Sequence, residues 1–393
     1  MEIKAHILLS NIAEALKSKA ETDIGNQKLQ PLGALDGAFG TLMFLSRYRK
    51  YADDSRLFSR VHDDYLNLCL SYLVNGFSYP TYCSGLSGIL YILRKEYSDS
   101  IDISDAEPVY DQVLKRYLDY YLSEDNWDLL HGVLGIGYYY LLRDDKPEIH
   151  DTIVAYLENN TQWDGEGGCR IKCVIDYQTG EKGYNIGLSH GMSGIIVYLS
   201  ALLRKYEQGR VRTLLEGFVN YVLQQRIDFA QYGSHFPTRT KSDLSGSRLA
   251  WCYGDLGICG ALYQAAGATK DASLRLCVAE ILNDDAQRYD LSKNLVYDSC
   301  ICHGTSGIAL IFNEFNKVMP GVLYQDAVNY WVDQTVDMAS FEDGIAGIKV
   351  YNAVDKVFRN EYDLLEGVTG VGLSLMSILY GESWADLMLI NLQ

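Results

Sequence analysis

The chain has 393 residues, of which 48% are hydrophobic and 22% charged. This globular composition excludes a disordered, collagen-like or coiled-coil protein. Its 34 lysines and arginines against 51 aspartates and glutamates give a formal net charge of −17, which disfavours nucleic acid and anionic membrane surfaces as partners.

Seven Gly-x-x-Gly pairs recur along the chain, and their first glycines are about 55 residues apart on average. Each pair opens an apolar segment, and each apolar segment follows an amphipathic one with the helical period. The first glycines are Gly37, Gly85, Gly132, Gly191, Gly254, Gly304 and Gly367. In chain order the predicted helix pairs are 3–20 with 40–45, 57–73 with 88–93, 106–123 with 135–142, 148–159 with 194–203, 211–227 with 257–263, 272–287 with 307–312, and 323–338 with 370–379.

Seven helix pairs form either an open solenoid or a closed ring. An open solenoid needs polar caps at both terminal faces, and neither end of this chain is more polar than its middle. We therefore expect an all-α fold, an α/α toroid with an inner ring of apolar helices and an outer ring of amphipathic ones, as a single domain over residues 1–393. The glycines would allow close backbone approach and expose the N-terminal amides of the inner helices; close packing alone is the alternative.

Two segments, 163–184 and 232–249, lack the helical period. They predict long loops with short strands at the rim of the ring. Long loops in a compact domain are usually functional.

The two residues before each first glycine are expected to line one mouth of the ring. These fourteen positions contain three of the nine cysteines and three of the seven histidines, a strong concentration. Their cysteines and histidines are Cys83, His131, His190, Cys252, Cys302 and His303.

Cys252 and Cys302 belong to neighbouring repeats, and His303 adjoins Cys302. Two thiolates and one imidazole form a three-ligand zinc site that leaves a fourth position open for a substrate. Such a thiolate-rich Zn²⁺ favours activation of a substrate thiol, and thus thiol addition or alkylation over hydrolysis.

Nine cysteines in 393 residues are too sparse for a disulfide scaffold. The sequence shows no signal peptide and no membrane span, so the chain is expected to be cytoplasmic. Cys83 lies too far around the ring to be a fourth ligand. Core thiols are expected at Cys69, Cys259, Cys277 and Cys300, and a second metal site at Cys169 and Cys173 is a weak alternative.

Four residues near the predicted metal can assist thiol addition. His190 is the candidate general acid or base, and Asp128 would orient it or else cap a helix. Arg248 would stabilise an enolate oxygen or brace its loop, and Tyr253 would assist either partner or lie in the core. His131 shares the register of His190 but is more often a structural residue at such a position; His6, His62 and His150 are expected at the surface.

Three motifs resemble the signatures of lanthionine synthetase C-like cyclases: residues 185–191 (NIGLSHG), residues 251–254 (WCYG) and residues 302–304 (CHG). The resemblance extends through all seven repeats. It implies an α/α toroid with one catalytic Zn²⁺ held by Cys252, Cys302 and His303.

The resemblance also implies a reaction, in which cysteine thiolates of a dehydrated precursor peptide add to dehydroalanine or dehydrobutyrine and form thioether rings. His190 matches the family's proton donor, and Asp128, Arg248 and Tyr253 match its supporting residues. Because repeats fill the chain, it resembles the stand-alone, class I type, with a separate dehydratase as partner. His131 departs from the family pattern, and the short early intervals leave out an inserted domain found in some members.

Three other functions stay open at this point. A non-cyclising relative that binds zinc and a thiol such as glutathione would share every motif. A toroidal prenyltransferase subunit would lack the adjacent cysteine and histidine. A toroidal glycosidase would use paired carboxylates, for which Asp36 and Glu366 are candidates, but these leave the cysteine and histidine cluster unexplained.

Overall fold

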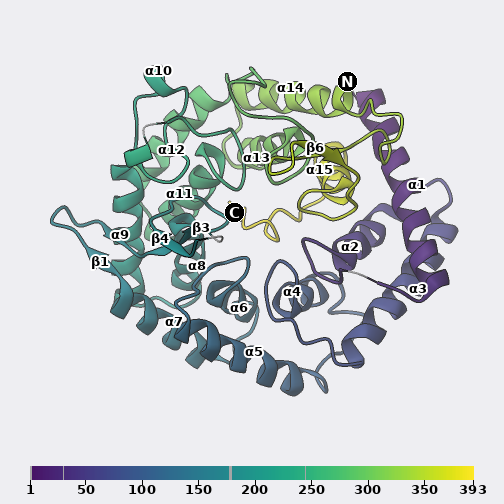
Figure 1. Cartoon of the computed structure of the whole chain (residues 1–393), viewed down its shortest axis with the longest axis horizontal. Helices are drawn as coiled ribbons and strands as arrows, with labels where there is room; N and C mark the ends of the chain where they lie inside the picture. Colours follow the sequence, from purple (N-terminus) through teal and green to yellow (C-terminus); the bar gives the residue numbers. More distant parts are fainter. Residues whose placement is uncertain (1, 30, 177–178, 244) are drawn as a thin grey trace. The chain divides into compact units, whose positions relative to one another are not determined.

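The computed structural model describes residues 2–29, 31–176, 179–243 and 245–393, which form mainly helices (Figure 1). The amphipathic helices are α1 (Glu2–Asn26), α3 (Ser55–Val74), α5 (Glu107–Ser123), α7 (Pro147–Asn160), α9 (Gly209–Gln224), α12 (Ala272–Asp285) and α14 (Val322–Met338). The apolar helices are α2 (Ala38–Tyr48), α4 (Leu86–Glu96), α6 (Val133–Tyr140), α8 (Met192–Lys205), α11 (Asp255–Thr269), α13 (Thr305–Val318) and α15 (Val368–Tyr380). All seven predicted pairs are therefore present, joined in the described residues by the one-turn α10 (Phe229–Tyr232) and the 3₁₀ helix Lys241–Asp243.

Burial separates the two kinds of helix as the sequence predicts. In α4, all residues from Leu86 to Leu93 are buried. In α3 the buried residues, such as Phe58, Val61, Tyr65 and Leu68, follow three- and four-residue steps along one face. Apolar side chains all around one helix require protein on every side, whereas a single stripe requires it on one side only.

Each apolar helix begins at a loop that folds back on itself. In six of the seven, the first helical N–H donates to the carbonyl seven residues earlier, at 2.7–3.2 Å, as Met192 does to Asn185. The expectation of exposed N-terminal amides is therefore wrong for the first N–H of these six helices, because the preceding loop already supplies its acceptor. Space for the loop comes from the second glycine of the pair: a Cβ on Gly307 would lie 1.9 Å from the carbonyl oxygen of Ile301.

The chain divides into two compact units. Unit 1 comprises Met1–Leu114, Tyr297–Asn313 and Asp326–Leu387, and unit 2 comprises Lys115–Val296, Glu314–Gln325 and Met388–Gln393. The single domain over residues 1–393 stays a prediction.

Unit 1 brings the last repeat next to the first. The N–H of Leu365 donates to the carbonyl of Leu35 at 2.8 Å, and the N–H of Leu35 donates to the carbonyl of Cys83 at 2.9 Å. The hydroxyls of Thr41 in α2 and Thr369 in α15 lie 3.3 Å apart, and Figure 1 shows these helices side by side although they come from opposite ends of the colour scale. An open solenoid would leave the first and last repeats apart, so this contact favours the closed ring.

Short antiparallel strands interrupt the helices. The predicted excursion at 163–184 contains β1 (Gln162–Trp163), β2 (Cys169–Arg170), β3 (Cys173–Asp176) and β4 (Glu181–Gly183), as expected. The second predicted loop contains an isolated bridge between Pro237 and Gly246. A further hairpin, β5 (Val350–Asn352) with β6 (Val357–Arg359), is not predicted, because β6 is exposed and has no alternating pattern to mark it.

Two histidines expected at the surface are buried instead. His62 is 2% exposed and its Nε2 lies 2.8 Å from the hydroxyl of Tyr97, while His150 is 4% exposed and its Nδ1 lies 2.9 Å from the hydroxyl of Tyr198. The expectation failed because both lie on the inward face of an amphipathic helix, where a tyrosine hydroxyl supplies the partner that a buried ring needs. Cys69, Cys259 and Cys300 are fully buried, as predicted, whereas Cys277 is only half-buried.

The segment after α15 is also buried. In unit 1 the indole N–H of Trp384 donates to the carbonyl of Leu373 at 2.9 Å. In unit 2 the indole N–H of Trp251 donates to the carbonyl of Met388 at 2.7 Å, and Gln264 donates to that of Leu389 at 2.8 Å. These contacts tie the segment to α15 in unit 1, and to α11 and the residue before Cys252 in unit 2.

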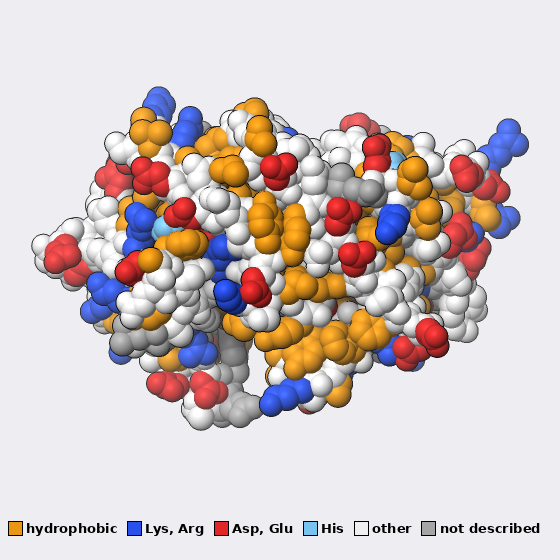
Figure 2. Space-filling view, turned by 90° about the horizontal axis from the view of Figure 1, so that it is seen from above, with side chains coloured by type: hydrophobic (Ala, Val, Ile, Leu, Met, Phe, Trp, Pro, Cys, Tyr) orange, Lys and Arg blue, Asp and Glu red, His pale blue; other side chains and the backbone are white. Residues whose placement is uncertain are grey.

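Charged side chains of both signs are interspersed on the face drawn in Figure 2. Such mixing agrees with the exclusion of polyanionic partners, which need a concentrated basic surface. Among the described helices, none combines the length and apolar character needed to cross a bilayer.

Candidate active site

Three rings from consecutive repeats lie in a row in unit 2. The ring centroids of His131 and His190 are 5.8 Å apart and nearly parallel, and those of His190 and Tyr253 are 6.3 Å apart. Each residue immediately precedes the first glycine of its pair. The loops of His131 and His190 share one backbone geometry, whereas the loop of Tyr253 differs at Gly254, whose φ is 123°. The structure thus places two predicted site residues side by side and adds His131 as a neighbour.

Asp128 contacts His190 and closes a turn, but it does not cap a helix: the N-cap of α6 is Gly132, which has no side-chain cap hydrogen bond. Its Oδ2 lies 2.7 Å from Nδ1 of His190, and its Oδ1 accepts a hydrogen bond from the backbone N–H of His131 at 2.7 Å. The same carboxylate therefore fixes the turn before α6 and orients the His190 ring at the start of α8. This contact also sets the tautomer, because a proton on Nδ1 leaves Nε2 available for proton transfer.

Opposing effects act on the pKa of His190. Burial lowers it, but the hydrogen bond and charge of Asp128, together with nearby Cys252, outweigh burial and raise the pKa above its usual 6.5. A raised pKa keeps a larger fraction of the imidazole protonated near neutral pH. This is the state that a general acid requires.

Tyr253 keeps its proton near neutral pH. Burial and, next, the neighbouring Cys252 raise the pKa of its hydroxyl to about 12, against a smaller lowering by a hydrogen bond with Asn185. A neutral phenol remains available as a hydrogen-bond donor. Gly187 provides space beside it, since a Cβ there would lie 2.9 Å from the carbonyl of Cys252 and 3.0 Å from the Tyr253 ring.

A pocket of about 380 Å³ opens in front of the histidines. Its lining includes Asp128, His131 and His190 together with Cys173 and Val174 of β3. Burial and, next, the charge of Asp128 raise the pKa of the Cys173 thiol to about 12, so it stays neutral. In the described residues Cys169 and Cys173 belong to none of the groups that could hold a metal ion, so the weak alternative of a second site there gains no support.

Arg248 lies half-buried in the loop before α11, and the residues on both sides of it are pinned. The carbonyl of Ser247 accepts a hydrogen bond from Arg288 at 3.0 Å, and the N–H of Leu249 donates to the carbonyl of Asn294 at 3.3 Å. The loop is therefore braced by its backbone, so this bracing does not depend on the Arg248 side chain, which stays available for the predicted role.

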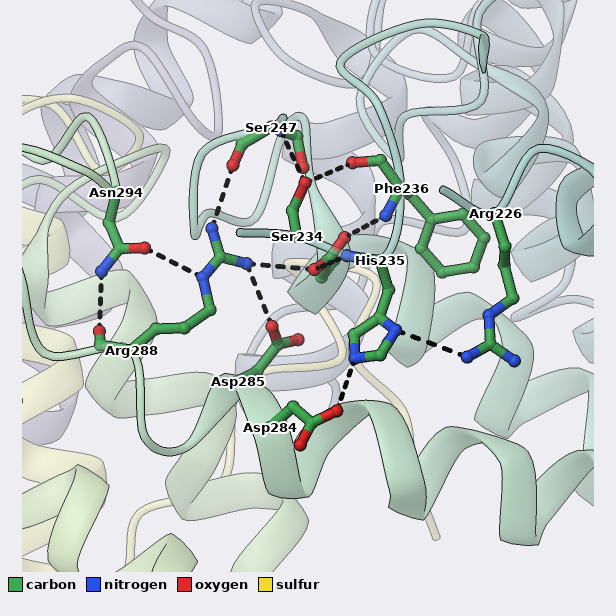
Figure 3. Close-up of polar contacts among 10 residues, drawn as sticks. Arg226, Ser234, His235, Phe236, Ser247, Asp284, Asp285, Arg288 and Asn294 are labelled. Carbon is green, nitrogen blue, oxygen red and sulfur yellow. Dashed lines mark hydrogen bonds and ion pairs between the residues drawn. The ribbon is translucent and has the colours of Figure 1, made fainter. Parts of the chain in front are cut away.

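Arg288 is the centre of that bracing network (Figure 3). Its guanidinium lies 3.0 Å from Asp255 Oδ2 and 3.0 Å from Asp285 Oδ1, and it donates to Asn294 at 2.9 Å. Asp255, the first residue of α11, also accepts from the backbone N–H groups of His235 and Phe236. The network thus ties the 232–249 loop to the helix that follows Cys252.

Burial and the nearby carboxylate of Asp255 raise the pKa of Asp285 well above its usual value, against the opposing effect of Arg288.

The sequence motifs do not reveal the supporting role of Arg288 and Asp255. Their only local signal is the position of Asp255 directly after Gly254, where a carboxylate suits the start of a helix.

In unit 1, His303 lies beside a buried carboxylate. Its Nε2 is 3.5 Å from Oδ2 of Asp298, whose side chain is 0% exposed. Asp298, Cys300 and His303 form a group whose possible ligand atoms all lie within 4.8 Å of one another. Burial favours the neutral acid, but the His303 ring and two backbone N–H groups outweigh it and hold the pKa of Asp298 below its usual range.

The predicted metal ligands are distributed over both units: Cys302 and His303 belong to unit 1 and Cys252 to unit 2. Cys302 is 8% exposed and Cys252 is 5% exposed. Nearly buried thiols and an imidazole are soft and borderline donors that suit Zn²⁺, so the donor set fits that ion chemically. Cys83, also in unit 1, is not among the residues of a candidate metal group in the described chain.

A family model described as "Lanthionine synthetase C-like protein" matches residues 29–389. The chain belongs to the lanthionine synthetase C-like family. It is 24% identical over 340 residues to the nisin biosynthesis protein NisC of Lactococcus lactis subsp. lactis, a match that covers 77% of each chain.

The solved structure of nisin cyclase matches this family member with a TM-score of 0.71 and 20% identity, covering 95% of this chain and 97% of the other. This likeness confirms the predicted fold class, the α/α toroid. The roles of individual site residues stay predictions.

Proposed function

We propose that this lanthionine synthetase C-like protein is a zinc-dependent lanthipeptide cyclase. It would add cysteine thiolates of a dehydrated precursor peptide to dehydroalanine or dehydrobutyrine, giving lanthionine or methyllanthionine rings. The observation that supports this most directly is the Asp128–His190 pair at the wall of the pocket, because thiol addition needs a proton donor. A separate dehydratase as partner and a cytoplasmic location stay predictions.

We assign Cys252, Cys302 and His303 as the ligands of one Zn²⁺. The bound ion would lower the pKa of a substrate thiol and hold it as a thiolate. With three protein ligands, one position is left for that thiol. The low exposure of both cysteines would limit the access of competing water.

His190 completes the addition. The new C–S bond forms at Cβ of the dehydroamino acid, the π electrons move toward the carbonyl, and the resulting enolate needs a proton at Cα. Protonated His190 donates that proton, and Asp128 stabilises the charge on the ring before transfer. The thiol proton released earlier can restore His190 through solvent, so protons balance over one turnover.

Arg248 and Tyr253 are assigned to the enolate oxygen. Arg248 contributes a positive charge and Tyr253 a neutral hydroxyl donor, and such donors are most effective where charge develops in the transition state. The braced loop around Arg248 would keep this arrangement preorganised.

Metal content tests the ligand assignment. The wild type is expected to contain about one zinc per chain, and Cys302→Ala to lose it, because a three-ligand site depends on each thiolate. Cys83→Ala is the matched control, since Cys83 occupies the same place in its repeat and is also buried. Elemental analysis that finds equal zinc in Cys302→Ala and wild type would contradict the assignment.

Cyclisation itself is measured on a dehydrated precursor by counting free thiols through alkylation and mass spectrometry. The wild type should consume thiols well above the spontaneous background, and His190→Ala should keep its zinc but lose this acceleration. A wild type that binds zinc and a small thiol but leaves the precursor thiols free would instead identify the non-cyclising relative.

A further inference from the structure

The loop before α13 contains a buried carboxylate that the proposed reaction has not used. Asp298 Oδ1 accepts a hydrogen bond from the N–H of Cys300 at 3.0 Å, and Oδ2 accepts one from the N–H of Tyr351 at 2.9 Å. Oδ2 also faces Nε2 of His303 at 3.5 Å. Both oxygens are therefore held by backbone, and one of them is aimed at the histidine.

Comparison with other repeats separates the turn-forming role of Asp298 from its charge. Six residues before the first glycine, repeats three and four have Asn126 and Asn185, whose Oδ1 atoms accept from the N–H two residues later at 3.3 and 2.8 Å. Asp298 occupies the same place in repeat six and makes the same bond. Asparagine suffices for this turn, so the carboxylate has a further reason to be there.

The surroundings keep Asp298 in one orientation. A Cβ on Gly304 would lie 2.3 Å from the backbone nitrogen of Cys300 and 2.6 Å from Asp298 Oδ1, so the turn that holds the carboxylate requires glycine there. Tyr351 reaches it from β5, which pairs with β6. The unpredicted hairpin thus fixes the oxygen that faces His303.

We propose that Asp298 is a positioning residue for His303, holding the proton on Nε2 so that Nδ1 presents its lone pair to Zn²⁺. This inference rests on the proposed zinc site. It assigns to Asp298 no contact with substrate or metal: the carboxylate acts through the imidazole, fixing its orientation and increasing its basicity as a ligand. The aspartate would therefore raise zinc affinity without changing the ligand set.

Asp298→Asn tests this directly, since asparagine supports the same turn in repeats three and four. Zinc affinity of the full chain, measured by competition with a chromophoric chelator, is expected to fall about 10–100-fold, the usual effect of losing such a partner. Asp355→Asn is the charge-matched control: Asp355 lies in the same unit and pairs with exposed Arg359, so its zinc affinity should equal that of the wild type.

Cobalt substitution distinguishes positioning from ligation. At saturating Co²⁺, Asp298→Asn should keep the thiolate charge-transfer and d–d bands of the wild type. Altered bands would make Asp298 a ligand and overturn the proposal, as would unchanged zinc affinity in Asp298→Asn. If the wild type binds no zinc, the zinc site itself fails, which is a separate result.

The protonated nitrogen of His303 can also be identified directly in the wild type. Nitrogen-15 NMR of histidine-labelled, zinc-loaded protein should show His303 with a protonated Nε2 and a metal-bound Nδ1. Metal on Nε2 and a proton on Nδ1 would refute the proposal even if Asp298→Asn failed to fold.

Discussion

At the scale of single residues, Asp128 shows how one side chain links folding to chemistry. Its Oδ1 closes the turn before α6 and its Oδ2 holds the His190 ring. Helix capping and orientation of His190 were alternatives for this residue in the sequence; α6 has no side-chain cap, and Oδ1 instead closes the turn that precedes the helix. A carboxylate is needed for the second role only, because an amide oxygen could accept the bond from His131.

Asp128→Asn separates these roles through the pH dependence of cyclisation. In the proposed mechanism protonated His190 is the active form, so activity should fall as pH rises through its pKa, which is raised above the usual 6.5 in the wild type. Removing the charge of Asp128 leaves burial to dominate and lowers that pKa. The basic limb of the kcat/KM profile should therefore move to lower pH.

Asp125→Asn is the control for that profile. Asp125 borders the same pocket but is exposed and pairs with Lys182. Its φ of 57° is a left-handed conformation that asparagine tolerates, so the substitution changes charge without strain. If the basic limb of the kcat/KM profile moved equally in Asp125→Asn and Asp128→Asn, or did not move in Asp128→Asn, Asp128 would not set the pKa of His190.

At the scale of elements, the start of each apolar helix determines where the site residues lie. The loop folds back so closely that its carbonyls touch the first helical turn. The residue two positions before the first helical residue, such as His190 or His303, thereby takes the same place within its own loop. Close approach at the second glycine is what makes this geometry possible.

Gly307→Ala is expected to destabilise the protein. Alanine normally favours a helix over glycine by about 0.5–1 kcal/mol, but here its Cβ would meet the Ile301 carbonyl, 1.9 Å away. Since backbone cannot yield as a flexible side chain can, we expect a loss of about 1–3 kcal/mol, typical of overpacked sites. Urea denaturation at a fixed zinc concentration measures this loss.

Gly25→Ala provides the opposite case. Gly25 lies near the end of α1, and an added Cβ would have no atom within 4 Å, so its substitution should be neutral or slightly stabilising. If Gly307→Ala and Gly25→Ala changed the urea midpoint by the same amount, close backbone approach would not explain why glycine occupies position 307.

At the scale of the whole molecule, local signals predicted the helices and long-range contacts remained hidden. The glycine period and the helical period located all fourteen paired helices, because both are properties of short segments. Asp298 meets Tyr351 from 53 residues away, and Arg288 meets Asp255 from 33 residues away. No local pattern marks either pair, so the supports of the site emerge only when the chain folds.

The segment after α15 makes further contacts of this long-range kind, with Trp251 and Gln264. Met388, Leu389 and Ile390 are at most 3% exposed in unit 2, and full burial of each such side chain contributes about 1.5–3 kcal/mol. Truncation after Leu387 would also remove the carbonyl acceptor of the Trp251 indole, at about 1–3 kcal/mol for a buried donor. It would remove one of the two carbonyls that accept from the Gln264 amide and leave that of Gly260. Because Trp251 adjoins Cys252, zinc affinity should fall together with stability.

Removal of Gln393 alone is the control, since this residue is exposed and its carbonyl meets only Arg204 among the hydrogen bonds described for it. The shorter truncation should melt at nearly the temperature of the full chain, and the longer one many degrees lower, with red-shifted tryptophan fluorescence. Equal melting temperatures and zinc affinities in the two truncations would mean that the tail merely covers α11. Lower values in the longer one would mean that the last residues of the chain help to form the loop in which Cys252 lies.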